Sequence, residues 1–408
     1  MNSRDRVLAA LQHQETDRVP IDLGGHRSSG VSAIAYPRLR AYLGLEPRPV
    51  RVYDMQQQLA VLDDDVLERF GVDTIELGRG FALSDADWVD WVLPDGAPCQ
   101  TPAWAVPERR EGGWALRSRT GRITGEMPDG ALYFESCYWP FVDGEFDHDS
   151  FEAALGECLW SIDSPPGPLI EGPGGDQRLV EGARRLRQST DRAVIALFGS
   201  MLFAAFDLYR MDSFLALMVE EPKQAHDILD RFTEHHIRAL ERYLGQVGSY
   251  IDIINFADDF GMQNGPLISP KMFREFFKER YGRIWQRAKE LADVKVMLHC
   301  CGSFRKVLPD LIDIGLDAIN PVQISAAGMD AGELKREFGR DITFWGGGCD
   351  TQWVLAHGTP EAVRDHVSRQ VEVMRPGGGF VFQQVHNVLA DVPPENIVAM
   401  LDTVLGAR

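Results

Sequence analysis

The chain has 408 residues and a formal net charge of -19 at pH 7, with 44% hydrophobic and 25% charged residues. These proportions are ordinary for a globular protein built around a sizeable core. The negative balance argues against binding to nucleic acid or to anionic membranes, because both depend on clustered basic side chains. No apolar run approaches about eighteen residues, and the polar amino-terminal stretch has no apolar signal core. We therefore expect a cytoplasmic protein without a transmembrane helix.

The first part of the chain alternates helical and extended patterns. Residues 2–14, 37–43 and 61–70 have helical spacing, and residues 17–23 and 73–77 have the apolar pattern of strands. Each of these two strand-like runs is soon followed by glycine, which favours a turn.

Residues 85–138 have a different character. They are rich in tryptophan, glycine and proline, and segments such as WALRSRTGRITGEM alternate and turn as β-hairpins do. We interpret this stretch as an antiparallel insertion, and we expect its tryptophans to serve mainly in packing, since each buries a large area.

After residue 177 the alternation of strands and helices becomes regular. Strand-like runs occur at the following residues: 193–198, 250–256, 294–298, 317–320, 342–345 and 379–383. Helical patterns lie between them, which predicts a parallel sheet. Together with the two early runs this gives up to eight strands, so we predict one (β/α)8 TIM-type barrel over residues 1–408 with the hairpin-rich insertion. An open doubly wound sheet is the alternative, although no GxGxxG or Walker A sequence follows an early strand.

The segment VKVMLHCCGS contains the most informative residues. Alternate residues of a strand share a face, so His299 and Cys301 point the same way at the end of the run 294–298, and Cys300 points the other way. Cys349 follows a later strand and three glycines. Two thiolates and one imidazole form a three-ligand zinc set with an open position, which is typical of catalytic zinc. The alternative is a buried thiol beside a hydrogen-bonded core histidine.

Other polar residues also follow strand ends, where a barrel carries its active site. Asp258 and His386 are candidate catalytic residues, acting as an acid or base or supporting the metal. Five further candidates would bind the substrate: His26, Arg27, Asp259, Asn320 and Gln383. For these positions a strand-end cap, an ion pair or another structural role is the alternative.

The sequence resembles the uroporphyrinogen decarboxylase superfamily, and within it the methyltransferase branch. The most specific segments are NFADDFGMQNGPLISPKMFREFFKERY, LHCCGS and WGGGCDTQ. The resemblance implies an (α/β)8 barrel, with zinc held by a His-x-Cys pair and a distant cysteine, which correspond to His299, Cys301 and Cys349. It also implies transfer of a methyl group between a methylated donor or corrinoid protein and a thiol or tetrahydrofolate-type acceptor.

Two features separate the chain from the decarboxylases of that superfamily. Where those enzymes carry Arg-Gln-Ala-Gly-Arg, this chain reads DLGGHRSSG, with Arg27 as its one arginine. A substrate with many carboxylates needs several cations, so decarboxylation of uroporphyrinogen or another carboxylated substrate without metal is the second hypothesis. No Asp-x-His-x-x-Gly cobalamin sequence is present, so we expect any corrinoid or tetrahydrofolate to come from outside the chain, a corrinoid on a separate protein. A non-catalytic corrinoid or tetrapyrrole carrier is the third hypothesis.

Overall fold

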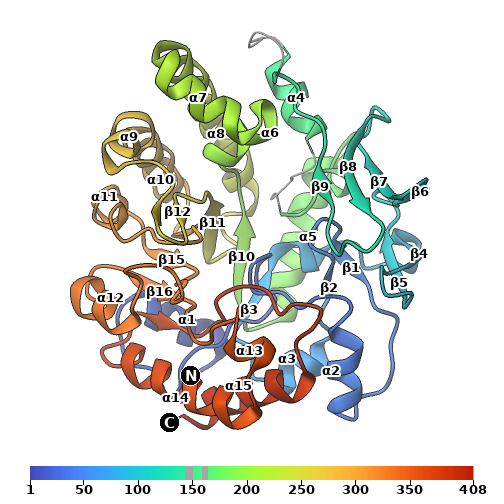
Figure 1. The fold of residues 1–408 in the computed structure, drawn as a ribbon, viewed down its shortest axis with the longest axis vertical. Coiled ribbons are helices and arrows are strands. Elements are labelled where there is room, and N and C mark those ends of the chain that lie inside the picture. The colour runs from blue at the N-terminus through green and yellow to red at the C-terminus, as the bar shows by residue number, and fades with distance from the viewer. Residues whose placement is uncertain (143–149, 159–163, 408) are drawn as a thin grey trace.

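A seven-stranded parallel sheet lies at the centre of the computed structural model, which describes residues 1–142, 150–158 and 164–407 (Figure 1). Its strand order is β17-β16-β15-β14-β11-β10-β3. The strands are β3 (Thr74–Glu76), β10 (Ala193–Leu197), β11 (Ile253–Ala257), β14 (Lys295–His299), β15 (Ala318–Asn320), β16 (Thr343–Trp345) and β17 (Phe380–Val381). Nearly all of their residues are buried, as expected for a sheet covered on both faces.

The sheet is strongly curled, and the segment around Ile21 contacts both of its edges. Ile21 forms a parallel bridge with Phe382 beyond β17. Its carbonyl oxygen accepts a hydrogen bond of 2.8 Å from the amide of Asp73, just before β3. The strand predicted at residues 17–23 is therefore reduced to a single bridge. Pro20 has no N–H with which to extend a ladder, which accounts for the shorter pairing.

Helices surround the curled sheet (Figure 1). They are α1 (Ser3–Leu11), α2 (Tyr36–Tyr42), α3 (Asp64–Arg69), α4 (Phe151–Glu157), α5 (Gly175–Ser189), α6 (Leu202–Tyr209), α7 (Met211–Glu220), α8 (Pro222–Val247), α9 (Pro270–Phe273), α10 (Glu279–Leu291), α11 (Leu308–Asp313), α12 (Ala331–Phe338), α13 (Val354–His357), α14 (Pro360–Met374) and α15 (Pro394–Gly406). Short 3-10 turns occur at Leu77–Gly80, Asp85–Asp87 and Gly167–Leu169. None of the helices in the described ranges is both long enough and apolar enough to cross a bilayer.

Several helix starts follow from the expected capping chemistry. The Ser269 side chain accepts a hydrogen bond from the amide of Met272, and Pro270 occupies the first helical position. The helix that begins there passes through a π-helical turn at Arg274–Lys278 into α10. Helix α6 was not predicted, because LFAAFDLY is apolar apart from Asp207 and has no clear helical periodicity.

The antiparallel hairpins predicted within residues 85–138 are confirmed. It contains β4 (Trp88–Val92), β5 (Pro98–Pro102), β6 (Glu108–Arg110), β7 (Gly113–Arg117), β8 (Ile123–Pro128) and β9 (Glu135–Ser136), all paired antiparallel. We call residues 85–138 the hairpin region; it lies beside the curled sheet (Figure 1). Trp91 and Trp114 pack edge to face at 5.4 Å between ring centroids. Two more short antiparallel strand pairs complete the strands: β1 (Val52–Asp54) with β2 (Leu59–Ala60), and β12 (Gly261–Met262) with β13 (Gly265–Pro266).

Candidate metal centre and its cavity

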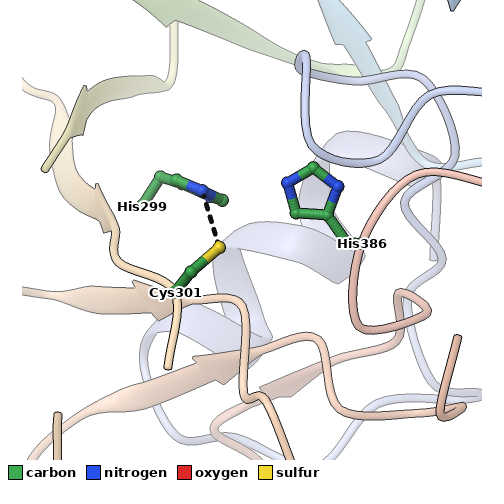
Figure 2. Close-up of side chains that lie close together, drawn as sticks. All are labelled: His299, Cys301 and His386. Carbon is green, nitrogen blue, oxygen red and sulfur yellow. Dashed lines mark hydrogen bonds between the residues drawn. The ribbon is translucent and has the colours of Figure 1, made fainter. Parts of the chain in front are cut away.

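Three potential metal ligands converge where strands of the sheet end. His299 is the last residue of β14, Cys301 follows two residues later, and His386 lies beyond β17. One ligand atom from each lies within 4.8 Å of the others. Figure 2 shows His299 and Cys301 together on one side and the ring of His386 on the other. The predicted neighbourhood of His299 and Cys301 is thus present in the structure.

The distances suit a zinc ion. His299 Nε2 lies 3.3 Å from Cys301 Sγ. Bond lengths of about 2.1 Å to nitrogen and 2.3 Å to sulfur would place such a pair roughly 3.5 Å apart around a tetrahedral ion. The two imidazole rings are 5.7 Å apart between centroids and inclined by 70°. A small inward movement of His386 would complete a three-ligand set.

Burial shifts the pKa of each of the three side chains in the cluster. It lowers the pKa of His299, and it lowers the pKa of His386 to about 3, with the neighbouring imidazoles adding to the effect. Both rings are therefore neutral at pH 7, with a lone pair to offer. Burial and the charge of Asp259 raise the pKa of the Cys301 thiol well above its usual range. A bound cation would reverse this effect, because metal binding deprotonates a coordinating thiol.

The cluster opens into a cavity of about 780 Å³. Of the predicted site residues, His26, Arg27, Asp259 and the three members of the cluster line it. One wall comes from the hairpin region and the turn after it, with Tyr133, Phe134 and Trp139. Helix α6 adds Phe203 and Phe206. The metal cluster therefore lies in a chamber with an aromatic wall and polar residues, of a size that holds a small molecule.

The two neighbouring aspartates have different surroundings. Asp259 lines the cavity, accepts a hydrogen bond of 2.6 Å from the Cys301 amide, and lies 3.9 Å from His299 Nε2. Burial raises its pKa, and the proximity of His299 opposes that rise. It is close enough to the cluster to hold a proton or a cationic group there.

Asp258 is fully buried behind the cavity. Its carboxylate accepts hydrogen bonds from the amides of Met201, Leu202 and Phe203, at 2.7 to 3.0 Å, and from the Tyr281 hydroxyl. Burial raises its pKa to about 7, against the effect of the three amides. This geometry favours a cap for the start of α6, and the predicted catalytic role remains a prediction.

Cys349, the predicted third ligand, does not join the cluster of ligand atoms found among the described residues. Its side chain is fully buried, and burial raises the pKa of its thiol. Its backbone lies close to His386, because its carbonyl accepts a hydrogen bond of 2.8 Å from the Val385 amide. Coordination by Cys349 remains a prediction that would require a different side-chain orientation.

Asn320 and Gln383 lie behind the metal cluster and do not line the cavity. Both are fully buried, and each is hydrogen-bonded to protein groups. His26 forms part of the same network through Gln383, and Arg27 lies 3.6 Å from Asp54. The structure thus separates the five predicted substrate residues into three that line the cavity and two that do not.

Asp207 is a cavity residue that the sequence analysis missed. It belongs to α6 and lines the chamber with Ser200 from the preceding turn. Burial raises its pKa well above the usual value, with Asp258 adding to the rise. A single aspartate in an apolar helix carries no recognisable motif, although its position among buried apolar residues was a signal that could have been followed.

The carboxyl-terminal part of the chain matches a known protein family. The family model described as "Uroporphyrinogen decarboxylase (URO-D)" matches residues 174–406, which is more than half of the chain. The chain belongs to the uroporphyrinogen decarboxylase family. The matched residues include strands β10 to β17 and all three members of the metal cluster. The predicted resemblance to this superfamily is confirmed.

Individual relatives are distant. A uroporphyrinogen decarboxylase of Alkalilimnicola ehrlichii is 25% identical over 196 residues, which is 46% of this chain and 48% of that protein. One from Psychromonas ingrahamii is 27% identical over 187 residues, or 45% and 49% of the two chains. The chain thus matches about half the length of these curated relatives.

A solved structure extends the likeness to the whole fold. A methyltransferase from Methanosarcina mazei superposes with a TM-score of 0.59 and 17% identity, covering 100% of this chain and 99% of that one. At this identity the likeness concerns the fold. The curled parallel sheet with its surrounding helices is therefore an arrangement that the two proteins share over their whole length.

Proposed function

We propose that the protein is a zinc-dependent methyltransferase. The observation that carries this proposal is the convergence of His299, Cys301 and His386 at one side of a cavity that has an aromatic wall. Imidazole and thiolate ligands favour zinc over the oxygen-seeking magnesium and calcium ions. Three protein ligands leave one position for a substrate atom, as catalytic zinc sites do.

Bound zinc would supply a Lewis acid that holds a thiol or similar acceptor in its deprotonated form. In the transfer, a bond forms between the acceptor and the methyl carbon, and the bond from that carbon to its donor breaks. The acceptor proton leaves, and Asp259, beside Cys301, is placed to receive it. The aromatic wall would help to orient the two reactants.

The identities of the methyl donor and of the acceptor are part of this proposal and do not follow from the geometry of the site. A methylated small molecule or a corrinoid carried on a separate protein would supply the methyl group, and a thiol or tetrahydrofolate-type acceptor would receive it. The likeness to the Methanosarcina methyltransferase supports this assignment at the level of the fold. The volume of about 780 Å³ admits the reactive end of such molecules.

Metal-free decarboxylation of uroporphyrinogen or another carboxylated substrate is the second candidate, because the distant curated relatives carry the name of that decarboxylase. The cavity lining weighs against a substrate with many carboxylates. Its arginines are Arg27 and Arg210, and several cations are needed for such a substrate. Incubation with uroporphyrinogen, followed by measurement of released carbon dioxide and of the decarboxylated porphyrinogen, separates the two candidates.

Metal analysis of the purified, reduced protein tests the main proposal. We expect about one zinc per chain in the wild type and loss of that zinc in His386→Ala. Cys99→Ala is the matched control, since Cys99 is a buried cysteine in β5 of the hairpin region. Cys349→Ala distinguishes the predicted ligand from the observed cluster. A wild type that stays free of zinc after zinc is added back would overturn the proposal.

A further inference from the structure

A buried chain of hydrogen bonds leads away from the metal cluster along the ends of the strands. It runs from His299 through Asn320 and Gln383 to His26 and Asp22. Each of the five residues has an exposed fraction of 7% or less. Polar groups in such surroundings must satisfy one another, so the orientation of each can be worked out from its neighbours.

The first orientation to be fixed is that of the Asn320 amide. Its Nδ2 donates to the Trp345 carbonyl oxygen at 2.9 Å and to Gln383 Oε1 at 2.8 Å. A backbone carbonyl only accepts, so the nitrogen end of the amide must face Trp345. Asn320 Oδ1 is then the atom that lies 2.8 Å from His299 Nδ1.

The state of the His299 ring follows directly. Asn320 Oδ1 is an acceptor only, so His299 Nδ1 must carry the hydrogen of this bond. In the neutral ring the lone pair is then on Nε2, the nitrogen that lies 3.3 Å from Cys301 Sγ. The asparagine therefore aims the free lone pair of the imidazole at the place where the metal would bind.

The rest of the chain prevents Asn320 from turning round. Gln383 Nε2 donates to the Ser28 carbonyl at 2.9 Å, which leaves its Oε1 as the acceptor for Asn320. His26 Nε2 lies 3.0 Å from the same oxygen and 3.1 Å from Asp22 Oδ2, so it donates toward both. Asp22 is itself held by donors on Trp345 and Thr74.

We propose that Asn320 is a positioning residue that fixes His299 as the Nδ1–H tautomer, and that Gln383, His26 and Asp22 hold Asn320 in that orientation. This inference rests on the proposed metal centre and gives three of the predicted substrate residues, Asn320, Gln383 and His26, a role in positioning. Neither Asn320 nor Gln383 needs to touch a substrate. Their contribution is a ring that is oriented for the metal before the metal arrives.

The tautomer can be measured in the metal-free wild type. Protein labelled with 15N-histidine is examined at about pH 8 by long-range proton–nitrogen correlation, which distinguishes the protonated ring nitrogen from the other. The His299 signals are assigned by their disappearance in His299→Gln. We expect hydrogen on Nδ1 both before and after zinc is added. A ring with its hydrogen on Nε2 in the metal-free protein would overturn the inference.

Zinc affinity supplies the second test, by competition with a chelator. Asn320→Leu keeps the approximate volume and removes the acceptor, so we expect zinc binding to weaken by about 10- to 100-fold. Gln383→Met leaves Asn320 its bond to Trp345, so we expect a smaller loss. An affinity of Asn320→Leu within about twofold of the wild type would contradict the positioning role.

The matched control is Asn396→Leu. Asn396 is also a buried asparagine, and its Nδ2 donates to the carbonyl oxygens of Leu355 and Gly358, away from the metal cluster. We expect this variant to lose stability and to keep its zinc affinity. If Asn320→Leu fails to fold, the tautomer of His299 measured in the wild type still tests the inference. A wild type that binds no zinc would overturn the proposed metal centre. The His299 tautomer measured in the metal-free protein tests the hydrogen-bond network independently of zinc binding.

Discussion

The curled parallel sheet and the hairpin region meet at one cavity, and they contribute different kinds of residue to it. The sheet supplies His299, Cys301 and His386, and behind them lies a fully buried network. The hairpin region and the turn after it supply an aromatic wall that includes Tyr133, with 39% of its surface exposed. The sheet therefore holds its three side chains in a buried, hydrogen-bonded framework, whereas the hairpin region contributes a partly exposed surface.

The family match divides the chain in nearly the same way. Residues 174–406 match the family model and contain the metal cluster, whereas the hairpin region lies outside the match. We infer that the chemistry belongs to the matched part and that the hairpin region adapts the cavity to this protein's own substrate. Loops and insertions over a barrel commonly play this part. Substitutions in the two regions should therefore have different effects on metal binding and on substrate binding.

The largest expected effect is that of Cys301→Ala in the sheet. We expect zinc to fall from about one per chain to almost none, and methyl transfer to fall by at least about a thousandfold. Cys300→Ala is the matched control, because Cys300 is fully buried and its sulfur accepts from the Phe260 amide instead of facing the cluster. Metal analysis and a methyl-transfer assay measure both variants. Retained zinc in Cys301→Ala would remove this residue from the ligand set.

The second prediction compares two glycines, one from each region. Gly302 has a φ of +77°, and an added Cβ would lie 2.5 Å from the carbonyl carbon of Gly261. Gly121 of the hairpin region has a φ of +86° and open space around it. We expect Gly121→Ala to cost about 1 kcal/mol from backbone strain alone, and Gly302→Ala about 3 kcal/mol or more. Urea unfolding of the metal-free variants measures the difference, and equal losses would mean that the turn after Cys301 tolerates movement.

The third prediction concerns Glu76 at the end of β3, where the chain leaves the sheet for the hairpin region. Burial raises the pKa of this carboxyl to about 7. The folded protein therefore binds the Glu76 proton more tightly than the unfolded chain does. The free energy of unfolding falls as the pH rises from about 4.5 to 7, because the folded protein must then ionise a buried carboxyl. Glutamine keeps the acceptor that receives the Gly78 amide at 2.8 Å.

We expect Glu76→Gln to be more stable than the wild type at pH 8 by about 1–3 kcal/mol, and to match it near pH 4. Denaturant unfolding at both pH values measures this change. The exposed Glu337→Gln, on the outer surface of α12, serves as the control and should show no comparable trend. A constant difference between wild type and Glu76→Gln across this range would show that the carboxyl is ionised in the folded protein as readily as in the unfolded chain.

The sequence predicted the fold where periodicity and motifs are strong. The predicted strands that lead to His299 and Asn320 are present as β14 and β15, and strand alternation correctly put His299 beside Cys301. The strand at residues 17–23 was overpredicted, because its apolar pattern says nothing about how few of its groups would pair. Helix α6 was missed because nearly uniform apolarity hides its period.

Site residues from different strands were harder to predict. Strand-end position alone did not distinguish Asn320 and Gln383, behind the cluster, from His386, which belongs to it. That distinction depends on side-chain direction at the ends of strands from different parts of the chain. Cys349 illustrates the same limit, since its backbone lies beside that of Val385 while its sulfur stands outside the cluster.

The smallest expected effect is that of Tyr133→Ala in the hairpin region. Because Tyr133 lines the cavity and is partly exposed, we expect KM for the methyl donor or acceptor to rise by about fivefold to tenfold, or about 1 kcal/mol. Zinc content and kcat should stay unchanged, since its side chain does not belong to the metal cluster. Tyr42→Ala, at a more exposed tyrosine of α2, is the matched control. Loss of zinc in Tyr133→Ala would show that the hairpin region also supports the metal, and an unchanged KM would mean that this wall does not contact the substrate; either result would break the division between the two regions.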